Sequence, residues 1–229
     1  MLRADMLAEL QSVLRANPSF ADWSEFTLLG YLAEGQDKFC EKTGYFIDIS
    51  SFSIVLQTNV AVYAIPDRVI QILDVWDGVK VLDKIDPGKV YRAEGWFESA
   101  PSGTPLAWRT DQETGVLKLY PTPTANEDGK ELILQVWRYS LYDLAGDGAI
   151  PETGPTPDAE PEIPSRFQRA CIEWAAYKAF NHHDTETQDP VKAADHLKAF
   201  DMYVIDGITA MRRYHGIDTR VEPSPVYRT

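Results

Sequence analysis

The pattern of apolar residues changes twice along the chain, and these changes limit the possible folds more than any single motif does. Over residues 1–44 apolar residues recur every three or four positions, as in amphipathic helices. Residues 45–140 instead carry short runs of β-branched and aromatic residues. Residues 164–216 return to helical spacing. This order predicts an α+β fold, in which N- and C-terminal helices form a bundle and an antiparallel β domain is inserted between them.

Five residues mark where helices begin and end. Ser24 can cap the start of a helix and Gly44 can end one in the left-handed conformation, so we predict a helix between them. Asp189 followed by Pro190 is a strong start signal, because the N–H that proline lacks would be unpaired in the first turn. Ser165 is a plausible cap for the helix that precedes this one.

Each of the last three helices carries an apolar stripe that we expect to face the core of the bundle. The first of these stripes consists of Phe26, Leu29, Leu32, Phe39 and Cys40. The next consists of Phe167, Cys171, Trp174 and Lys178, and the last of Leu197, Phe200, Val204, Ile208 and Met211. Both cysteines lie in these patterns. Two cysteines are too few for a disulfide scaffold, so reduced and buried structural thiols are expected.

The run LKLYPTP at residues 117–123 shows how the β domain is built. Leu117 and Leu119 alternate on one face of a strand, and the next strand does the same with Leu132, Leu134 and Val136. This period of two is typical of half-buried antiparallel strands. Pro121 cannot donate a hydrogen bond to a ladder, so the strand must end at Tyr120.

The chain is acidic, with a formal net charge of −13. A sequence-reading DNA-binding protein needs clustered Lys and Arg, and an anionic membrane surface would also repel this chain. Residues 141–163 contain several prolines and neither Lys nor Arg, which predicts an extended acidic loop. The acidic residues of this loop are Asp143, Asp147, Glu152, Asp158, Glu160 and Glu162. They could line a wall that DNA passes without adhering, or they could simply keep the protein soluble.

No sequence motif points to catalysis. The chain lacks a nucleophile elbow, a Walker loop, an HExxH motif and a dinucleotide-binding glycine motif. Glu94 and Glu98, close to two aromatic residues, could form a glycosidase pair, but a polar helix face or loop is the favoured interpretation because carboxylates are abundant in this chain. We therefore predict neither an enzyme nor a bound cofactor.

The histidine-rich patch is a candidate metal site with a simpler alternative. His182, His183 and Asp184 are consecutive, and His196 follows later. Adjacent side chains on a helix point apart, whereas metal ligands must converge. We therefore predict a solvated turn between two helices and no bound metal.

Four aromatic residues lie near the end of the β domain, namely Tyr120, Trp137, Tyr139 and Tyr142. They fit the packing of a strand face, and they also fit a partner surface, since interfaces are enriched in Tyr and Trp. No apolar run approaches the ~20 residues that span a bilayer. The N-terminus alternates charged residues with leucines and is unlike a signal peptide, so we expect no passage through a membrane by a cleaved signal.

The order of several phrases resembles a known family. These phrases are YLAEGQDKFCEKTG at 31–44, VAVYAIPDRVIQILDVW at 60–76, GVLKLYPTP at 115–123 and EIPSRFQRACIEWAAYKAF at 162–180. Together they resemble the head-to-tail adaptor proteins of tailed bacteriophages, also called connector or head-completion proteins. The similarity is greatest to the adaptors and tail-tubular proteins of short-tailed phages, and it covers nearly the whole chain.

The resemblance implies a structural role in the phage neck. Adaptors of this kind form rings, typically of about twelve copies, under the portal protein. The ring extends the DNA channel and offers a platform for a downstream tail or nozzle protein. The implied partners are therefore the portal protein, neighbouring copies and DNA that passes without sequence-specific binding, with no membrane partner. The implied location is the virion neck, after assembly in the host cytoplasm.

The C-terminal segment, residues 217–229, has no periodicity and two prolines, so it is predicted to be an extended arm. It could be an idle tail, which is the usual state of a terminus. The resemblance instead favours an arm that docks on the portal or a neighbouring copy. The residues that would make this contact are Arg212, Arg213, Ile217, Arg220, Val221, Val226, Tyr227 and Arg228. Two other functions remain open: a cell-wall-processing or carbohydrate-binding tail component, and a tail-tube or terminator protein.

Overall fold

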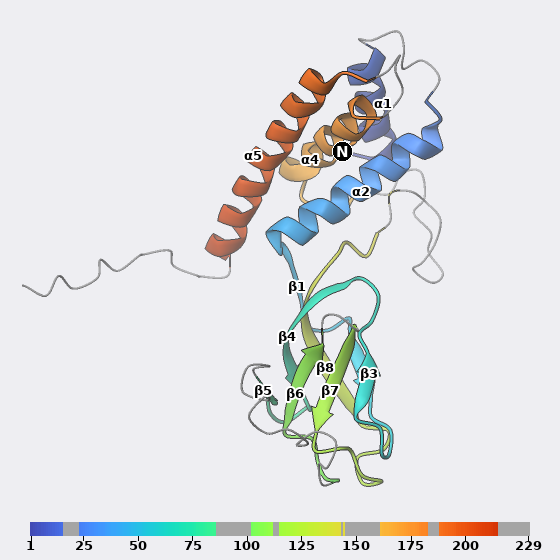
Figure 1. The fold of residues 1–229 in the computed structure, drawn as a ribbon. Helices are drawn as coiled ribbons and strands as arrows, with labels where there is room; N and C mark the ends of the chain where they lie inside the picture. Colours follow the sequence, from blue (N-terminus) through green and yellow to red (C-terminus); the bar gives the residue numbers. More distant parts are fainter. Residues whose placement is uncertain are drawn as a thin grey trace, which may run out of the picture. The chain divides into compact units, whose positions relative to one another are not determined.

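The computed structural model describes most of the chain, namely residues 1–15, 23–85, 102–111, 115–142, 144, 161–182 and 188–214. The chain divides into two compact units (Figure 1). The helical unit comprises Met1–Tyr45 and Ser140–Thr229, and the β unit comprises Phe46–Tyr139. The combination of helices and sheets confirms the predicted α+β class. The predicted arm, residues 217–229, lies outside the described residues.

The helical unit is organised around one central helix. Its described helices are α1 (Arg3–Arg15), α2 (Glu25–Thr43), α4 (Ser165–Phe180) and α5 (Pro190–Tyr214). Helix α4 contacts all three of the others, and its small residues Ala170, Ala175 and Ala176 are fully buried. A helix covered on several sides does not show a single apolar stripe. None of the described helices combines the length and the apolar character needed to cross a bilayer.

The ends of α2 are capped as predicted. The Ser24 side chain accepts a hydrogen bond from the Thr27 N–H (3.2 Å). At the other end Gly44 is left-handed, with φ +58°, and its N–H donates to the carbonyl of Cys40 (2.9 Å). Each contact satisfies a backbone group that the helix itself leaves unpaired.

The starts of α4 and α5 differ from one another. Helix α5 begins at Pro190, and the carboxylate of Asp189 accepts a hydrogen bond from the Lys192 N–H (3.1 Å), as predicted. The prediction for α4 is wrong, because Pro164 occupies the cap position and Ser165 is already helical. The start of α4 has no side-chain cap.

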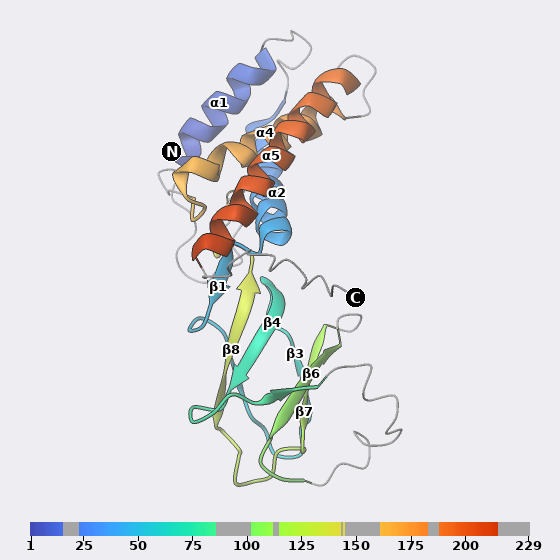
Figure 2. The same ribbon diagram turned by 90° about the vertical axis from the view of Figure 1, so that its left-hand side faces the viewer.

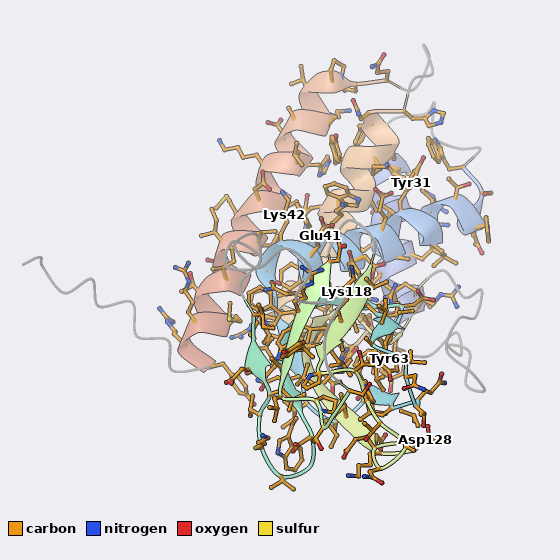
Figure 3. All side chains as sticks on the ribbon, turned by 60° about the horizontal axis from the view of Figure 1, so that its bottom comes forward. Tyr31, Glu41, Lys42, Tyr63, Lys118 and Asp128 are labelled. Atoms are coloured by element: carbon orange, nitrogen blue, oxygen red, sulfur yellow. The ribbon has the colours of Figure 1, made fainter. Side chains whose placement is uncertain are left out.

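The predicted apolar stripes of α2 and α5 are confirmed only in part. In α2, Leu32, Phe39 and Cys40 are buried, but Phe26 is 67% exposed and Leu28 is buried in its place. In α5, Phe200 and Val204 are buried as predicted. The salt bridge between Lys42 Nζ on α2 and Asp201 Oδ1 on α5 (2.9 Å) also joins these two helices. Figure 3 labels Lys42.

Two four-stranded sheets make up the β unit. In the first, β8 (Glu131–Arg138) pairs antiparallel with β1 (Phe46–Asp48), β2 (Ser53–Val55) and β4 (Val69–Trp76). The views in Figures 1 and 2 agree that β4 lies beside β8. The second sheet has the order β3 (Val62–Ala64), β7 (Val116–Tyr120), β6 (Ala107–Asp111) and β5 (Asp83–Lys84). Only the short β5–β6 pair is parallel among the described strands.

Alternating leucines form the core of the β unit, as the sequence predicts. Leu117 and Leu119 of β7 are buried, and so are their counterparts on β8, namely Leu132, Leu134 and Val136. Trp108 of β6, which pairs with Leu119 of β7, is also fully buried and donates its indole N–H to the carbonyl of Leu82 (3.2 Å). Strand β7 ends at Tyr120, immediately before Pro121, as predicted.

Candidate partner-binding surfaces

The outer face of α5 exposes large apolar side chains. Met202 and Ile205 are 62% and 63% exposed, although Phe200 and Val204 on the same helix are buried. Residues three positions apart on a helix are neighbours, so Met202 and Ile205 form one exposed patch. We call this pair the α5 stripe, and it shares no residue with the buried stripe predicted for the same helix. These two side chains give α5 a small exposed apolar surface in addition to its buried face.

The end of α5 carries a concentration of positive charge. Arg212 and Arg213 occupy its last turn and are exposed, and Tyr214 beside them is 87% exposed. Cations are favourable at the C-terminal end of a helix, because the backbone carbonyls there are unpaired. The structure thus places the first two predicted contact residues on the surface. The others, namely Ile217, Arg220, Val221, Val226, Tyr227 and Arg228, lie outside the described residues.

The β unit displays a second apolar surface on a tight turn. Val79 is 90% exposed at the tip of residues 76–81, which we call the 76–81 turn, and Trp76 and Val81 flank it as exposed residues. Trp76 and Val81 form an antiparallel bridge across the base of the turn. Three exposed large apolar residues in six positions are unusual for a chain that has ample charge for its surface.

Hydrogen bonds fix the shape of the 76–81 turn. The Asp77 carboxylate accepts from the N–H groups of Val79 (2.9 Å) and Lys80 (2.7 Å), and the Asp77 N–H donates to the Lys80 carbonyl (3.0 Å). Desolvation would raise the pKa of Asp77, but these hydrogen bonds outweigh it and hold the pKa below its usual value. Gly78 has φ +90°, a conformation that favours glycine.

The predicted acidic loop has a closed base. The Glu162 carboxylate accepts hydrogen bonds from the Leu141 N–H (2.8 Å) and the Ser140 hydroxyl (3.2 Å). Near the start of the loop, the Gln36 amide of α2 donates a hydrogen bond to the Tyr142 carbonyl (2.6 Å). Glu162 therefore joins the two ends of the loop. The remaining acidic residues, namely Asp143, Asp147, Glu152, Asp158 and Glu160, lie outside the described residues.

The described histidines are held in separate contacts. The ring of His182 meets Trp23 edge-on, with 5.2 Å between ring centroids. His196 Nδ1 lies 2.7 Å from a Glu173 carboxylate oxygen, and its ring stacks on Phe180. Within the described parts of the chain, no three or more His, Cys, Asp and Glu side chains are placed to hold a metal ion. The neighbouring candidates His183 and Asp184 lie outside the described residues, as do Glu94 and Glu98.

Glu173 belongs to a network of polar contacts between helices. Burial would raise its pKa, but hydrogen bonds from His196 and Arg169 outweigh burial and lower it. Arg169 also bridges to Glu9 on α1 (3.3 Å). This chain of polar contacts links α1, α4 and α5, so it serves to hold the helices together.

Of the four aromatic residues near the end of the β domain, three are partly covered. Tyr120, Trp137 and Tyr139 are half-buried, and the Tyr139 ring also lies 5.3 Å from the Arg68 guanidinium. Strand-face packing accounts for these three residues. Tyr142 is exposed, and it belongs to the helical unit.

Both cysteine thiols should be inert in the folded protein. Cys40 and Cys171 form no disulfide and are fully buried, and burial raises the pKa of Cys171 far above its usual value. We expect Ellman's reagent to label neither thiol within an hour at pH 8 and to label both after addition of urea. Rapid labelling of the native protein would contradict the buried position of either thiol.

Comparison with known proteins identifies the family of the chain. The family described as SU10 adaptor protein matches residues 1–224. Phage adaptors of this family are structural proteins of the virion, located at the neck, and the family implies interaction with portal and tail proteins. A comparison with curated proteins gives no match. Because the family match extends over almost all of its 229 residues, the chain belongs to the SU10 adaptor protein family.

Proposed function

We propose that the protein forms a ring, of about twelve copies, beneath the portal protein in the neck of a short-tailed phage. The ring extends the channel through which DNA passes and offers a platform for a tail or nozzle protein. The observation that carries this proposal is the family match from residue 1 to residue 224. The exposed apolar and cationic surfaces of α5 support it, because a ring subunit must contact neighbours through surfaces that are free in the isolated chain.

The C-terminal arm, residues 217–229, makes the contact with the portal or with a neighbouring copy. Helix α5 leads into this arm through Arg212 and Arg213, which are exposed. An extended segment that docks on another chain can bury a large area for its length, although ordering it costs free energy. The arginines and the apolar residues Ile217, Val221, Val226 and Tyr227 supply both kinds of contact.

The acidic residues of the loop face the DNA channel. A wall that carries Asp143, Asp147, Glu152, Asp158 and Glu160 repels phosphates, so DNA slides along it without adhering. Glu162 contributes differently, because its carboxylate closes the base of the loop. The net charge of −13 also keeps free copies apart before they meet their template in the host cytoplasm.

Deleting residues 217–229 tests the arm. We expect the shortened protein to fold with an unchanged circular dichroism melting curve, because the arm follows the last described helix. Its affinity for portal-containing heads should fall at least tenfold, about 1.4 kcal/mol. A full-length variant with Arg220→Glu and Arg228→Glu serves as a control for the charge contribution. Normal head completion by the shortened protein would refute the role of the arm.

A further inference from the structure

The two exposed apolar surfaces belong to different units of the chain. The α5 stripe consists of Met202 and Ile205 in the helical unit, and the 76–81 turn presents Val79 in the β unit. Water makes the exposure of such side chains unfavourable, and exposed apolar surfaces of this kind often mark interaction sites. A narrow turn can lie against a row of side chains along a helix, so the two surfaces are candidates for contact with one another.

The 76–81 turn is ready to dock without rearrangement. Three hydrogen bonds of Asp77 hold its backbone, and the Leu82 N–H donates to the Val75 carbonyl (2.8 Å) just behind it. Ordering a loop on binding costs free energy, so a turn that is already fixed binds at lower cost. A rigid apolar tip with a 90% exposed valine therefore suits insertion against a partner.

One charged residue beside each surface has the sign opposite to the other: Lys80 on the turn and Asp206 on α5. Lys80 is exposed next to Val79 on the turn. Asp206 is exposed one helical turn after Met202 and next to Ile205. Within the described parts of the chain, neither Lys80 nor Asp206 forms a salt bridge. An apolar contact between turn and stripe would bring these two groups together, and opposite charges at a rim favour the correct register.

We propose that the 76–81 turn of one copy docks on the α5 stripe of a neighbouring copy. Val79 then contacts Met202 and Ile205, and Lys80 pairs with Asp206. The contact is heterologous, because the two partners contribute different surfaces. Each copy can give its turn to one neighbour and its stripe to the other, which allows contacts to continue around a ring. This inference rests on the proposed ring and specifies how its subunits meet.

Mixed cysteine variants test the contact directly. Full-length Val79→Cys and Ile205→Cys proteins are prepared separately, and the native Cys40 and Cys171 do not interfere because they are buried. The two variants are mixed with oxidised glutathione, both at about 100 µM in solution and on portal-containing heads that lack the protein. We expect disulfide-linked dimers in the mixture at ten times or more the amount formed by either variant alone.

A matched control separates docking from random collision. Val55→Cys places a thiol at another exposed valine of the β unit, on β2, and is mixed with Ile205→Cys. This pair should stay at the background level. Equal yields from the control and test mixtures, on heads and in solution, would overturn the proposal. So would dimers of Val79→Cys alone or of Ile205→Cys alone at the yield of the mixture, because they would indicate a symmetric contact.

Charge reversal tests the register. Lys80→Glu in the Val79→Cys protein should reduce cross-linking about fivefold, since it places a carboxylate against Asp206. Asp206→Lys in the Ile205→Cys protein should restore the yield. If Asp206→Lys does not restore the yield, the proposed contact between turn and stripe is wrong, because that contact places residues 80 and 206 next to each other.

Electron microscopy distinguishes this inference from the proposed function. Wild-type protein incubated with portal-containing heads should add a ring below the portal. A ring without cross-linking would refute only the contact between turn and stripe. Cross-linking in solution without any ring on the heads would refute the proposed position under the portal and leave the contact intact.

Discussion

Replacing Asp48 with alanine should lower the free energy of unfolding of the β unit by about 3–5 kcal/mol. Asp48 lies on β1 and is 9% exposed, and its carboxylate accepts a hydrogen bond from the Arg138 guanidinium on β8 (2.8 Å). The Arg138 guanidinium also lies 4.9 Å from the centre of the Phe46 ring. Removing the carboxylate takes a negative partner away from this buried cation, and breaking a buried ion pair from one side costs more than the intact pair contributes.

The same carboxylate makes the β unit sensitive to acid. Burial would raise the pKa of Asp48, but hydrogen bonds from Ser50, Ser51 and Arg138 outweigh burial and lower it to about 2, against 3.8 for the free side chain. Because the folded pKa is the lower one, the stabilisation is fully present above about pH 4 and is lost as the pH falls through 2. The wild-type free energy of unfolding should therefore fall by about 2 kcal/mol more than that of Asp48→Ala between pH 5 and pH 2.

Urea unfolding followed by pulsed hydrogen exchange in peptides from β8 measures these effects, since it follows the β unit separately. Asp74→Ala is the control, because Asp74 is exposed on β4, and it should change stability by less than about 0.5 kcal/mol. The double variant Asp48→Ala, Arg138→Met should be more stable than Asp48→Ala, because it removes the buried charge together with the carboxylate that was its partner. Equal stability of Asp48→Ala and Asp74→Ala would show that the pair is not a structural requirement.

Local signals in the sequence predict much of the fold, because they depend on a few neighbouring residues. Ser24 and Gly44 bound α2 through contacts within one helical turn. Pro121 ends β7 through its own missing N–H. The alternation of Leu117 and Leu119 predicts which strand face is buried, since the period of two holds for any strand. These features need no knowledge of the rest of the structure.

Burial on a helix depends on what covers it, and the sequence does not state this. Phe26 and Leu28 are both apolar and close together on α2, but only Leu28 lies where other helices pack. The α5 stripe was missed for the same reason. Met202 and Ile205 have the spacing of an apolar face, and so do Phe200 and Val204, and only the packing of the unit shows which pair is covered.

The 76–81 turn shows the same limit for a candidate site. Asp77 and Gly78 predict a turn, and the turn is present. Val79, however, belongs to the stretch GVKVLDKI at 78–85, whose β-branched residues indicate a strand. Its exposure follows from the hydrogen bonds of Asp77, which place it at the tip. The exposure of Arg212 and Arg213, by contrast, follows from their residue type, because a cation is rarely buried without a partner.

The contact between α2 and α4 depends on a glycine, and alanine at this position should be strongly destabilising. A Cβ atom on Gly35 would lie 2.9 Å from the Cys171 carbonyl oxygen and 3.0 Å from both Cys171 Cα and Trp174 Cβ. These atoms include the backbone of α4, which cannot turn aside as a side chain can. Gly35→Ala should therefore lower the free energy of unfolding of the helical unit by about 1–3 kcal/mol through overpacking.

The same substitution elsewhere in α2 should have the opposite effect. A Cβ atom on Gly30 has nothing within 4 Å, so Gly30→Ala gains helix propensity, up to about 1 kcal/mol, without a clash. On α5, a Cβ atom on Gly207 would meet the tip of the Phe39 ring at 2.7 Å and the Thr43 methyl at 2.9 Å. Gly207→Ala should fall between the two α2 variants, because side-chain ends yield more readily than backbone.

Urea unfolding, followed by hydrogen exchange in peptides from α4, measures the free energy of unfolding of the three variants. We expect this free energy to differ between Gly30→Ala and Gly35→Ala by about 2–4 kcal/mol. Both variants place the same residue in the same helix, so propensity and the unfolded chain contribute equally and cancel in the comparison. The gap therefore measures the close approach of α2 and α4 alone. Equal stability of these two variants would mean that the two helices can separate without cost, and the central packing of α4 would then not be what holds the helical unit together.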